Sequence, residues 1–174
     1  MARLTNCINM LDEGIARVQQ AIPDMPMTDG MLARLLLLVG SSAQQELERK
    51  LKPHKLSDSE FLTLMILFSR PDGSSSPGEL CEYTSQGATN MTRIANVLLK
   101  RGLITRGTSA EDRRRVLIRI TAPGRRFVRQ MLPSLFPGLV MTFAGFSDSD
   151  KRSLSRLLRK LACNLEQMDI QAAP

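Results

Sequence analysis

Apolar side chains recur at three- and four-residue spacing along much of the chain, a pattern typical of amphipathic helices. The spacing predicts one helix in the first twenty residues and a second from about Asp29 to the Lys50 region, each followed by prolines that end it. A third helix is expected after Ser57, because Ser57 and Glu60 form a capping-box pattern ahead of an apolar stripe. The same pattern at 147–150 predicts a last helix.

The middle of the chain predicts two helices joined by a short turn, followed by a hairpin. A short helix starts at Pro77, a turn follows at 84–87, and a second helix with a regular apolar stripe ends at Gly102. Apolar and polar residues then alternate, which predicts a strand at 103–106 and a returning strand at 116–120. Two helices with a tight turn between them are the helix-turn-helix arrangement that places its second helix in the major groove of DNA.

The polar face of the second of these helices carries side chains suited to base recognition. Asn can pair with adenine edges, Arg with guanine edges, and the Thr methyl group can contact the thymine methyl. The candidates for the major groove are Thr89, Asn90, Thr92, Arg93 and Asn96.

The loop of the expected hairpin is long and basic. An Arg run can enter a narrow minor groove, where the negative potential is enhanced, and Asp112 can hold the Arg114 guanidinium by a charge-assisted hydrogen bond. The candidates for this wing are Asp112, Arg113, Arg114 and Arg115. A solvated loop in which Asp and Arg neutralise each other is the alternative.

Positive charge is concentrated in one segment. Residues 100–129 hold ten basic and two acidic side chains, a net charge of +8, whereas the rest of the chain holds 14 basic and 15 acidic ones, a net charge of −1. Such a distribution is typical of a phosphate-binding footprint, although a solvated basic face has the same composition. We expect Lys100, Arg101 and Arg106 at backbone phosphates and Arg125, Arg126 and Arg129 at solvent or a partner.

Together these residues resemble the MarR family of winged-helix regulators, and within it the EmrR/MprA type of multidrug-efflux repressor. The resemblance extends from about Leu32 to the C-terminus. It rests on Glu79-Leu80, the run 89–95, the strand entry 100–104, the wing 112–114 and the segment Leu117…Thr121…Gly124. Two positions differ from many relatives, Ala88, where Arg is common, and Ser85, where the turn often has Gly.

The resemblance implies a mainly α fold. Residues 53–122 would form a winged helix-turn-helix DNA-binding region with a small β-hairpin wing. A helical dimerisation domain would be built from residues 1–52 and 123–174. The apolar stripes at both ends of the chain exceed what a winged helix needs for its own core, which also favours an isologous homodimer.

The resemblance further implies a homodimeric repressor of multidrug-efflux genes. It would bind a pseudo-palindromic operator in double-stranded DNA and be released by a small aromatic or amphipathic ligand. Arg34 is the candidate effector-binding residue, because it lies in a Leu-x-Arg-Leu pattern of the efflux-repressor type. An ion pair on the helix surface is an equally good interpretation of this arginine.

Two other functions remain open. Some relatives sense peroxide through an N-terminal cysteine, so Cys7 raises the hypothesis of a redox-sensing repressor with the same fold. The basic wing also fits an architectural protein that binds DNA without sequence preference.

An enzyme is not expected, because the chain has a single histidine, His54, and none of the common catalytic or nucleotide-binding motifs. No cofactor is expected either. Cys7, Cys81 and Cys163 lie far apart without Cys-x-x-Cys spacing, so neither a disulfide framework nor a zinc site is indicated. The charge-free run 130–147 contains Pro133 and Pro137 and is interpreted as a broken packing segment without a membrane span. With no secretory signal in the first residues, we expect the protein in the cytoplasm.

Overall fold

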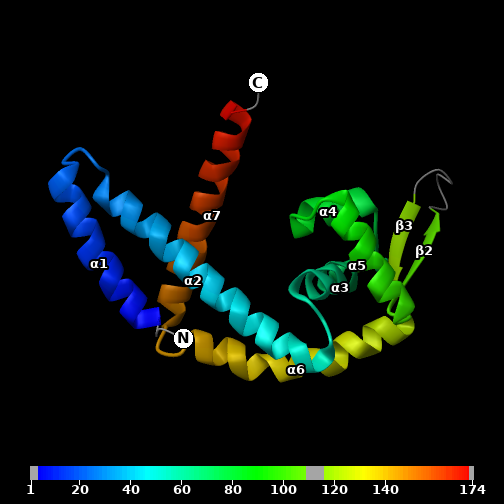
Figure 1. Ribbon diagram of the computed structural model, residues 1–174. Helices are drawn as coiled ribbons and strands as arrows, with labels where there is room; N and C mark the ends of the chain where they lie inside the picture. The colour runs from blue at the N-terminus through cyan, green and yellow to red at the C-terminus, as the bar shows by residue number, and fades with distance from the viewer. Residues whose placement is uncertain (1–3, 109–115, 173–174) are drawn as a thin grey trace. The chain divides into compact units, whose positions relative to one another are not determined.

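In a computed structural model of the chain, the described residues are 4–108 and 116–172, with side chains described as far as 168 (Figure 1). They form two units, with the boundary in the chain after Met131. The elements of the first unit are α1 (Leu4–Ala21), α2 (Met27–Leu51), η1 (Lys52–His54), α3 (Asp58–Ser69), β1 (Ser74–Ser75), α4 (Pro77–Thr84), α5 (Ala88–Lys100), β2 (Ile104–Thr108) and β3 (Val116–Ile120). Helix α6 (Ala122–Thr142) continues past the boundary, and α7 (Asp148–Ala172) follows.

Helices α1 and α2 form a hairpin at the N-terminal end of the first unit (Figure 1). Their positions confirm the two helices predicted from the apolar spacing. The turn between them ends at Pro26, whose carbonyl accepts a hydrogen bond from the N–H of Gly30 at 2.9 Å. Only Ile15 of α1 and Leu51 of α2 are buried, so most of the apolar stripe on both helices is half-buried or exposed.

The core of the first unit lies among the end of α2, the helices α3 to α5, the sheet and the beginning of α6. Each leucine removed from water there stabilises the fold by roughly 1.5–3 kcal/mol. The largest fully buried side chains include Leu51, Leu64, Leu67, Leu80, Met91, Ile94, Leu98, Ile104, Ile118 and Val128.

Two capping boxes fix where α3 and α4 begin. In the predicted one, the N–H of Glu60 donates to the Ser57 hydroxyl at 3.3 Å and the N–H of Ser57 donates to the Glu60 carboxylate at 3.0 Å. Ser76 and Glu79 form a second box with the same two distances. Each box satisfies two N–H groups that the first turn of a helix leaves without a backbone partner.

The sheet has three antiparallel strands in the order β1-β3-β2. The predicted hairpin is confirmed, with pairs from Ile104↔Ile120 to Thr108↔Val116. The segment before Pro77, for which we predicted no strand, contributes β1 to the other edge of β3 through the pairs Ser74↔Arg119 and Ser75↔Ile118. A strand of two residues is too short to show an alternating pattern, which is why the sequence does not reveal it.

The expectation of a broken segment at 130–147 is wrong for residues 130–142, because α6 runs through both Pro133 and Pro137. A proline inside a helix removes one N–H donor and strains the preceding turn. The remaining backbone bonds of α6 carry the helix past both positions. Among the residues that the structure describes, no helix is long and apolar enough to cross a membrane.

Helix α7 begins where the sequence predicts. The N–H of Asp150 donates to the Ser147 hydroxyl at 3.2 Å, and the N–H of Ser147 donates to the Asp150 carboxylate at 2.9 Å. Acidic side chains at this end also interact favourably with the helix dipole. The last predicted helix is thereby confirmed.

A tight backbone junction joins the end of α5 to the start of α6. The N–H of Thr121 donates to the carbonyl of Leu103 at 3.0 Å, and the Thr121 hydroxyl donates to the carbonyl of Gly102 at 2.7 Å. The same hydroxyl caps α6 by accepting from the N–H of Gly124 at 2.9 Å. A Cβ atom on Gly124 would lie 2.1 Å from the Leu103 carbonyl oxygen, so only glycine fits this position.

We therefore expect Gly124→Ala to lower the free energy of unfolding by about 1–3 kcal/mol, because the added methyl group forces the junction apart. Gly78 in the first turn of α4 is a matched control, since a Cβ atom there has no neighbour within 4 Å. Gly78→Ala should raise the free energy of unfolding by about 0.5–1 kcal/mol, because alanine is the better helix former. Urea denaturation measures both values, and a loss of equal size in the two variants would contradict the role of the close contact.

Candidate nucleic-acid interface

The turn between α4 and α5 is closed by backbone hydrogen bonds. The N–H of Gln86 donates to the carbonyl of Cys81 at 3.0 Å, and that of Ser85 donates to the carbonyl of Glu82 at 3.2 Å. Ser85 itself has the left-handed conformation, with φ 51° and ψ 40°. This conformation favours glycine, which explains why the resembling family often has glycine here. The turn sets the direction in which α5 leaves the core.

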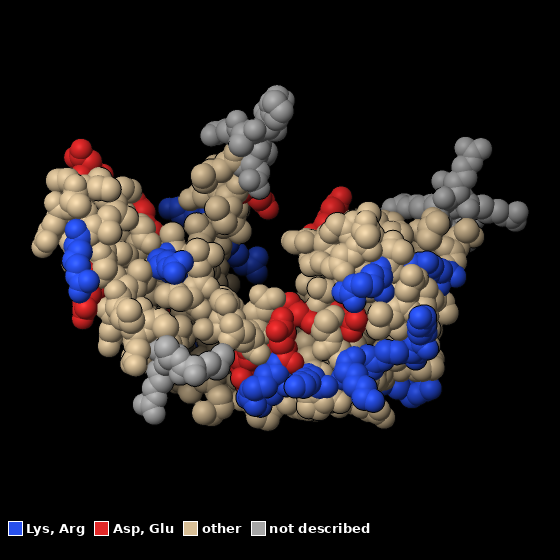
Figure 2. All heavy atoms as spheres, viewed as in Figure 1, with Lys and Arg blue, Asp and Glu red and all other residues tan. Residues whose placement is uncertain are grey.

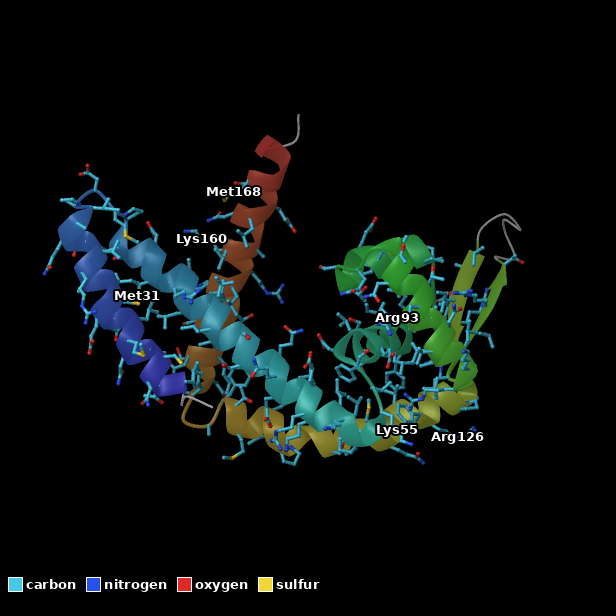
Figure 3. All side chains as sticks on the ribbon, in the orientation of Figure 1. Met31, Lys55, Arg93, Arg126, Lys160 and Met168 are labelled. Carbon is cyan, nitrogen blue, oxygen red and sulfur yellow. The ribbon has the colours of Figure 1, made fainter. Side chains whose placement is uncertain are left out.

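Helix α5 has a buried face and a polar face. Met91, Ile94, Ala95 and Leu98 are buried against the core. The structure places all five candidate residues away from that core: Thr89, Thr92, Arg93 and Asn96 are exposed, and Asn90 is half-buried. Figure 3 labels Arg93 on this helix. The five side chains thus lie together on one accessible surface, as a recognition helix requires.

The hydroxyl of Thr92 is already used within the helix. It donates to the carbonyl of Ala88 at 2.9 Å. The methyl group of Thr92 is therefore the part best suited to a base contact, of the kind that threonine makes with thymine.

The four wing candidates Asp112, Arg113, Arg114 and Arg115 lie outside the described residues. The strands that lead to the wing are described as far as the pair Thr108↔Val116. Arg106 on β2 is exposed, as is Lys100 at the end of α5. Both remain accessible to a phosphate.

Arg101 has a different role from the phosphate contact that we expected. Its guanidinium donates to the carbonyls of Lys55 at 2.7 Å and His54 at 3.1 Å. It also lies over the ring of Phe127, 5.1 Å from the centroid. With two carbonyls and an aromatic face as partners, Arg101 ties the end of α5 to the segment after α2 and to α6.

The arginines of α6 divide in a similar way. Arg125, which we expected at solvent or a partner, is half-buried and lies over the ring of Phe68 at 5.9 Å within the first unit. Arg126 and Arg129 are exposed. In the view of Figure 2, Lys and Arg side chains gather along the edge where Figure 3 labels Lys55 and Arg126, apart from Arg93 on α5. The basic surface therefore extends beyond the candidate recognition helix.

A cluster around Glu79 supports the start of α4 and is absent from our sequence predictions. Arg70 forms an ion pair with Glu79 at 3.3 Å and lies over the ring of Tyr83 at 5.5 Å. The Ser75 hydroxyl donates to the same carboxylate at 2.8 Å. The backbone N–H of Ser76, then the Ser75 hydroxyl and the Arg70 charge, hold the pKa of Glu79 below its usual range. The capping pattern of Ser76 and Glu79 was the signal that could have revealed this cluster.

The other candidate residues are dispersed. Arg34 is exposed on α2, and Cys7 is half-buried on α1. Cys7, Cys81 and Cys163 are free thiols. Within 4–108 and 116–172, no three His, Cys, Asp or Glu side chains are grouped so that they could hold a metal ion.

Comparisons with known proteins identify the fold. A sequence model of the MarR family matches residues 54–115. The transcriptional repressor MprA of Escherichia coli (strain K12) is 33% identical over 146 residues, which cover 84% of this chain and 83% of MprA. A mutant of MarR from E. coli, solved in complex with operator DNA, has a TM-score of 0.66 and 23% identity, covering 82% of this chain and 96% of that one.

A second similar structure is that of BpsR from Bordetella bronchiseptica, a protein whose DNA binding is regulated by 6-hydroxynicotinic acid. Its TM-score is also 0.66, with 23% identity, covering 75% of this chain and 91% of BpsR. The mainly helical architecture with a small antiparallel sheet is the winged-helix fold of these regulators.

The Glu79 cluster gives a pH-dependent prediction. Glu79→Gln keeps an oxygen for the Ser76 N–H but removes the charge beside Arg70, so we expect the free energy of unfolding at neutral pH to fall by roughly 0.5–1 kcal/mol for this solvent-screened pair. Because the folded pKa lies below the ordinary 4.5, the stabilisation by the carboxylate is complete above that pH and is lost as the pH falls through the folded value.

Wild type and Glu79→Gln should therefore converge in stability in acid. Urea denaturation at neutral and acidic pH checks this, with Glu82→Gln, an exposed residue of the same helix, as the control. A difference between wild type and Glu79→Gln that stays constant into acid would contradict the assignment.

Proposed function

The chain belongs to the MarR family, and on that basis we propose that it is a sequence-specific, homodimeric transcriptional repressor of multidrug-efflux genes. A small aromatic or amphipathic ligand would release it from its operator. The observation that carries the proposal is the exposed polar face of α5 in a chain that is 33% identical to the repressor MprA. The proposal includes neither a catalytic step nor a cofactor, and its place of action is the cytoplasm.

Recognition of double-stranded DNA would use two parts of the first unit. Helix α5 would enter the major groove with Thr89, Asn90, Thr92, Arg93 and Asn96 toward bases and flanking phosphates. The wing residues Asp112, Arg113, Arg114 and Arg115 would reach the adjacent minor groove. Exposed cations such as Lys100 and Arg106 would add phosphate contacts that do not depend on sequence.

Dimerisation is supported by apolar side chains that each unit leaves exposed. On α7 these are Leu157, Leu158, Leu161, Leu165 and Met168, with Leu165 51% and Met168 64% exposed. Leu32 and Leu37 on α2 are 59% and 64% exposed. Large exposed apolar patches are rare on monomers, so these side chains support a subunit interface.

We assign residues 1–52 and 123–174 to dimerisation and residues 53–122 to DNA binding. A two-fold partner would cover the apolar faces of α1, α2, α6 and α7. The two α5 helices would then read half-sites of a pseudo-palindromic operator one helical turn apart, about 34 Å.

Ligand release rests on the family and on the similarity to BpsR, whose DNA binding is regulated by 6-hydroxynicotinic acid. A ligand that binds better to a conformation with the wrong half-site spacing shifts the population away from DNA. Arg34, exposed on α2, is our candidate partner for an acidic group on the ligand. The efflux role is supported by the similarity to MprA.

Sequence-specific binding is tested by comparing a DNA fragment upstream of the chain's own gene with a random duplex of equal length. We expect the upstream fragment to bind about a thousandfold more tightly or better at physiological salt. Fluorescence anisotropy over a series of salt concentrations measures both affinities. Equal affinity, with a steep salt dependence for both duplexes, would instead identify an architectural DNA-binding protein.

Arg114→Ala belongs in the same experiment. It should weaken binding to both duplexes and reduce the slope of log affinity against log salt by about 0.9, because one phosphate-neutralising cation is lost. Arg17→Ala on α1, far from α5 in the sequence and exposed, is the control and should leave the slope unchanged.

Dimerisation is tested on α7. Replacing Leu157 and Leu165 together by lysine should raise the dimer dissociation constant by more than about tenfold, since each leucine contributes roughly 1.5–3 kcal/mol when it is buried. Ser153→Lys adds charge at an exposed polar position of the same helix and is the control. Analytical sedimentation measures the constants. A monomeric wild type at micromolar concentration would refute the dimer.

A further inference from the structure

Three side chains at the start of α5 form a continuous chain of hydrogen bonds. The Gln86 amide nitrogen donates to the carbonyl of Thr84 at 3.2 Å. The Asn90 amide nitrogen in turn donates to the Gln86 amide oxygen. Nε of Arg93 then donates to the Asn90 amide oxygen at 3.0 Å. We call Gln86, Asn90 and Arg93 the α5 relay.

The direction of the α5 relay is fixed from its inner end. A carboxamide has one donating and one accepting side. Because the Thr84 carbonyl can only accept, Gln86 must present its oxygen to Asn90, and Asn90 must then present its oxygen to Arg93. Turning either amide over would place two donors against each other. Thr84 is buried at the end of α4, so the relay starts from a fixed point in the core.

Helix capping does not explain the relay. The N-cap of α5 is Gly87, and no side chain makes a capping hydrogen bond there. Asn90, at the third position of the helix, is where a capping box places the residue that reaches back to the N-cap. Its amide is bonded to Gln86 and Arg93 instead, so the hydrogen bonds of Asn90 serve the orientation of Arg93.

We propose that Gln86 and Asn90 are positioning residues that orient Arg93 for end-on contact with a guanine, an inference that rests on the proposed DNA-binding function. With Nε bonded to Asn90, the two terminal amino groups of the exposed Arg93 form the fork that would meet a base. Such a fork matches the O6 and N7 acceptors of guanine in the major groove. One donor and one acceptor of the Asn90 amide are thus already engaged within the protein, which makes the orientation of Arg93 its first role.

Orientation in the free protein matters because a long side chain loses rotamer freedom when it binds. Arg93 is exposed, and an unrestrained exposed arginine would lose that freedom on contact with DNA. The relay restricts it beforehand. The loss of Gln86 should therefore weaken binding by about three- to tenfold, chiefly for duplexes that carry the guanine.

The test is a double-mutant cycle on the full chain, with duplexes that the wild-type protein selects from a random-sequence library. Gln86→Met keeps the length of the side chain and removes the acceptor for Asn90. We expect Gln86→Met to weaken binding about three- to tenfold in the wild-type background and less than twofold in the Arg93→Ala background. If the fold-losses of affinity from Gln86→Met and Arg93→Ala simply multiply in the double variant, the relay is overturned.

Two controls separate positioning from a general loss of structure. Thr89 lies on the same face but outside the relay. The fold-losses of affinity caused by Thr89→Ala and Arg93→Ala should therefore multiply in the double variant. Gln86→Glu keeps an acceptor for Asn90 but loses the donor to Thr84, so its preference for guanine over other bases at the affected position should fall between those of the wild type and Gln86→Met. A Gln86→Met protein that loses thermal stability and binds selected and random duplexes equally more weakly would show a merely structural role and overturn the proposal.

The outcomes also separate this inference from the function on which it rests. A wild-type protein that selects no sequence from the library overturns the proposed function together with the relay. A wild type that selects a sequence, combined with independent effects of Gln86 and Arg93, overturns the relay alone.

Discussion

The backbone contact between the start of α6 and the carbonyl of Leu103 determines how α5 is held. Thr121 bonds to the carbonyls of both Gly102 and Leu103, and Gly124 comes too close to Leu103 for any side chain. From the other side, Arg101 bonds to carbonyls after α2. The C-terminal end of α5 is therefore positioned by main-chain groups and one arginine in addition to its buried face, and none of these contacts uses its polar face.

The helices were predictable because their causes are local. Apolar spacing within three or four positions and the Ser57–Glu60 box are complete within a few residues of sequence. Contacts between residues far apart in the chain could not be predicted from such local patterns. Arg101 meets carbonyls 46 and 47 positions earlier, and no spacing rule connects them. Helix α6 shows that a local signal can also mislead. Its two prolines predict a break, but the hydrogen bonds of the neighbouring turns keep the helix continuous.

The polar face of α5 was predictable in its members but not in its connections. Polar residues on one side of an amphipathic helix follow from the periodicity, and the structure places all five candidates of α5 there. Gln86 precedes the helix, and its link to Asn90 depends on the left-handed turn at Ser85, which sequence spacing does not reveal. The distribution of charge along the sequence also did not identify which arginines are available to DNA. Arg101 and Arg125 in the basic segment lie over Phe rings, whereas Arg93 stands outside that segment.

The leucines of α7 also bear on how the protein persists in a cell. Of the described residues after Met131, Leu135 alone is buried, so the second unit has almost no hydrophobic core within one chain. In a dimer of the kind proposed, the free energy of unfolding of this unit follows the law of mass action and varies with the logarithm of the protein concentration. Scarce copies are then less folded as well as less often bound to the operator, and unfolded copies are accessible to proteases. For such a dimer, the steepness of the genetic response would depend on the abundance of the protein through its folding as well as its occupancy of the operator.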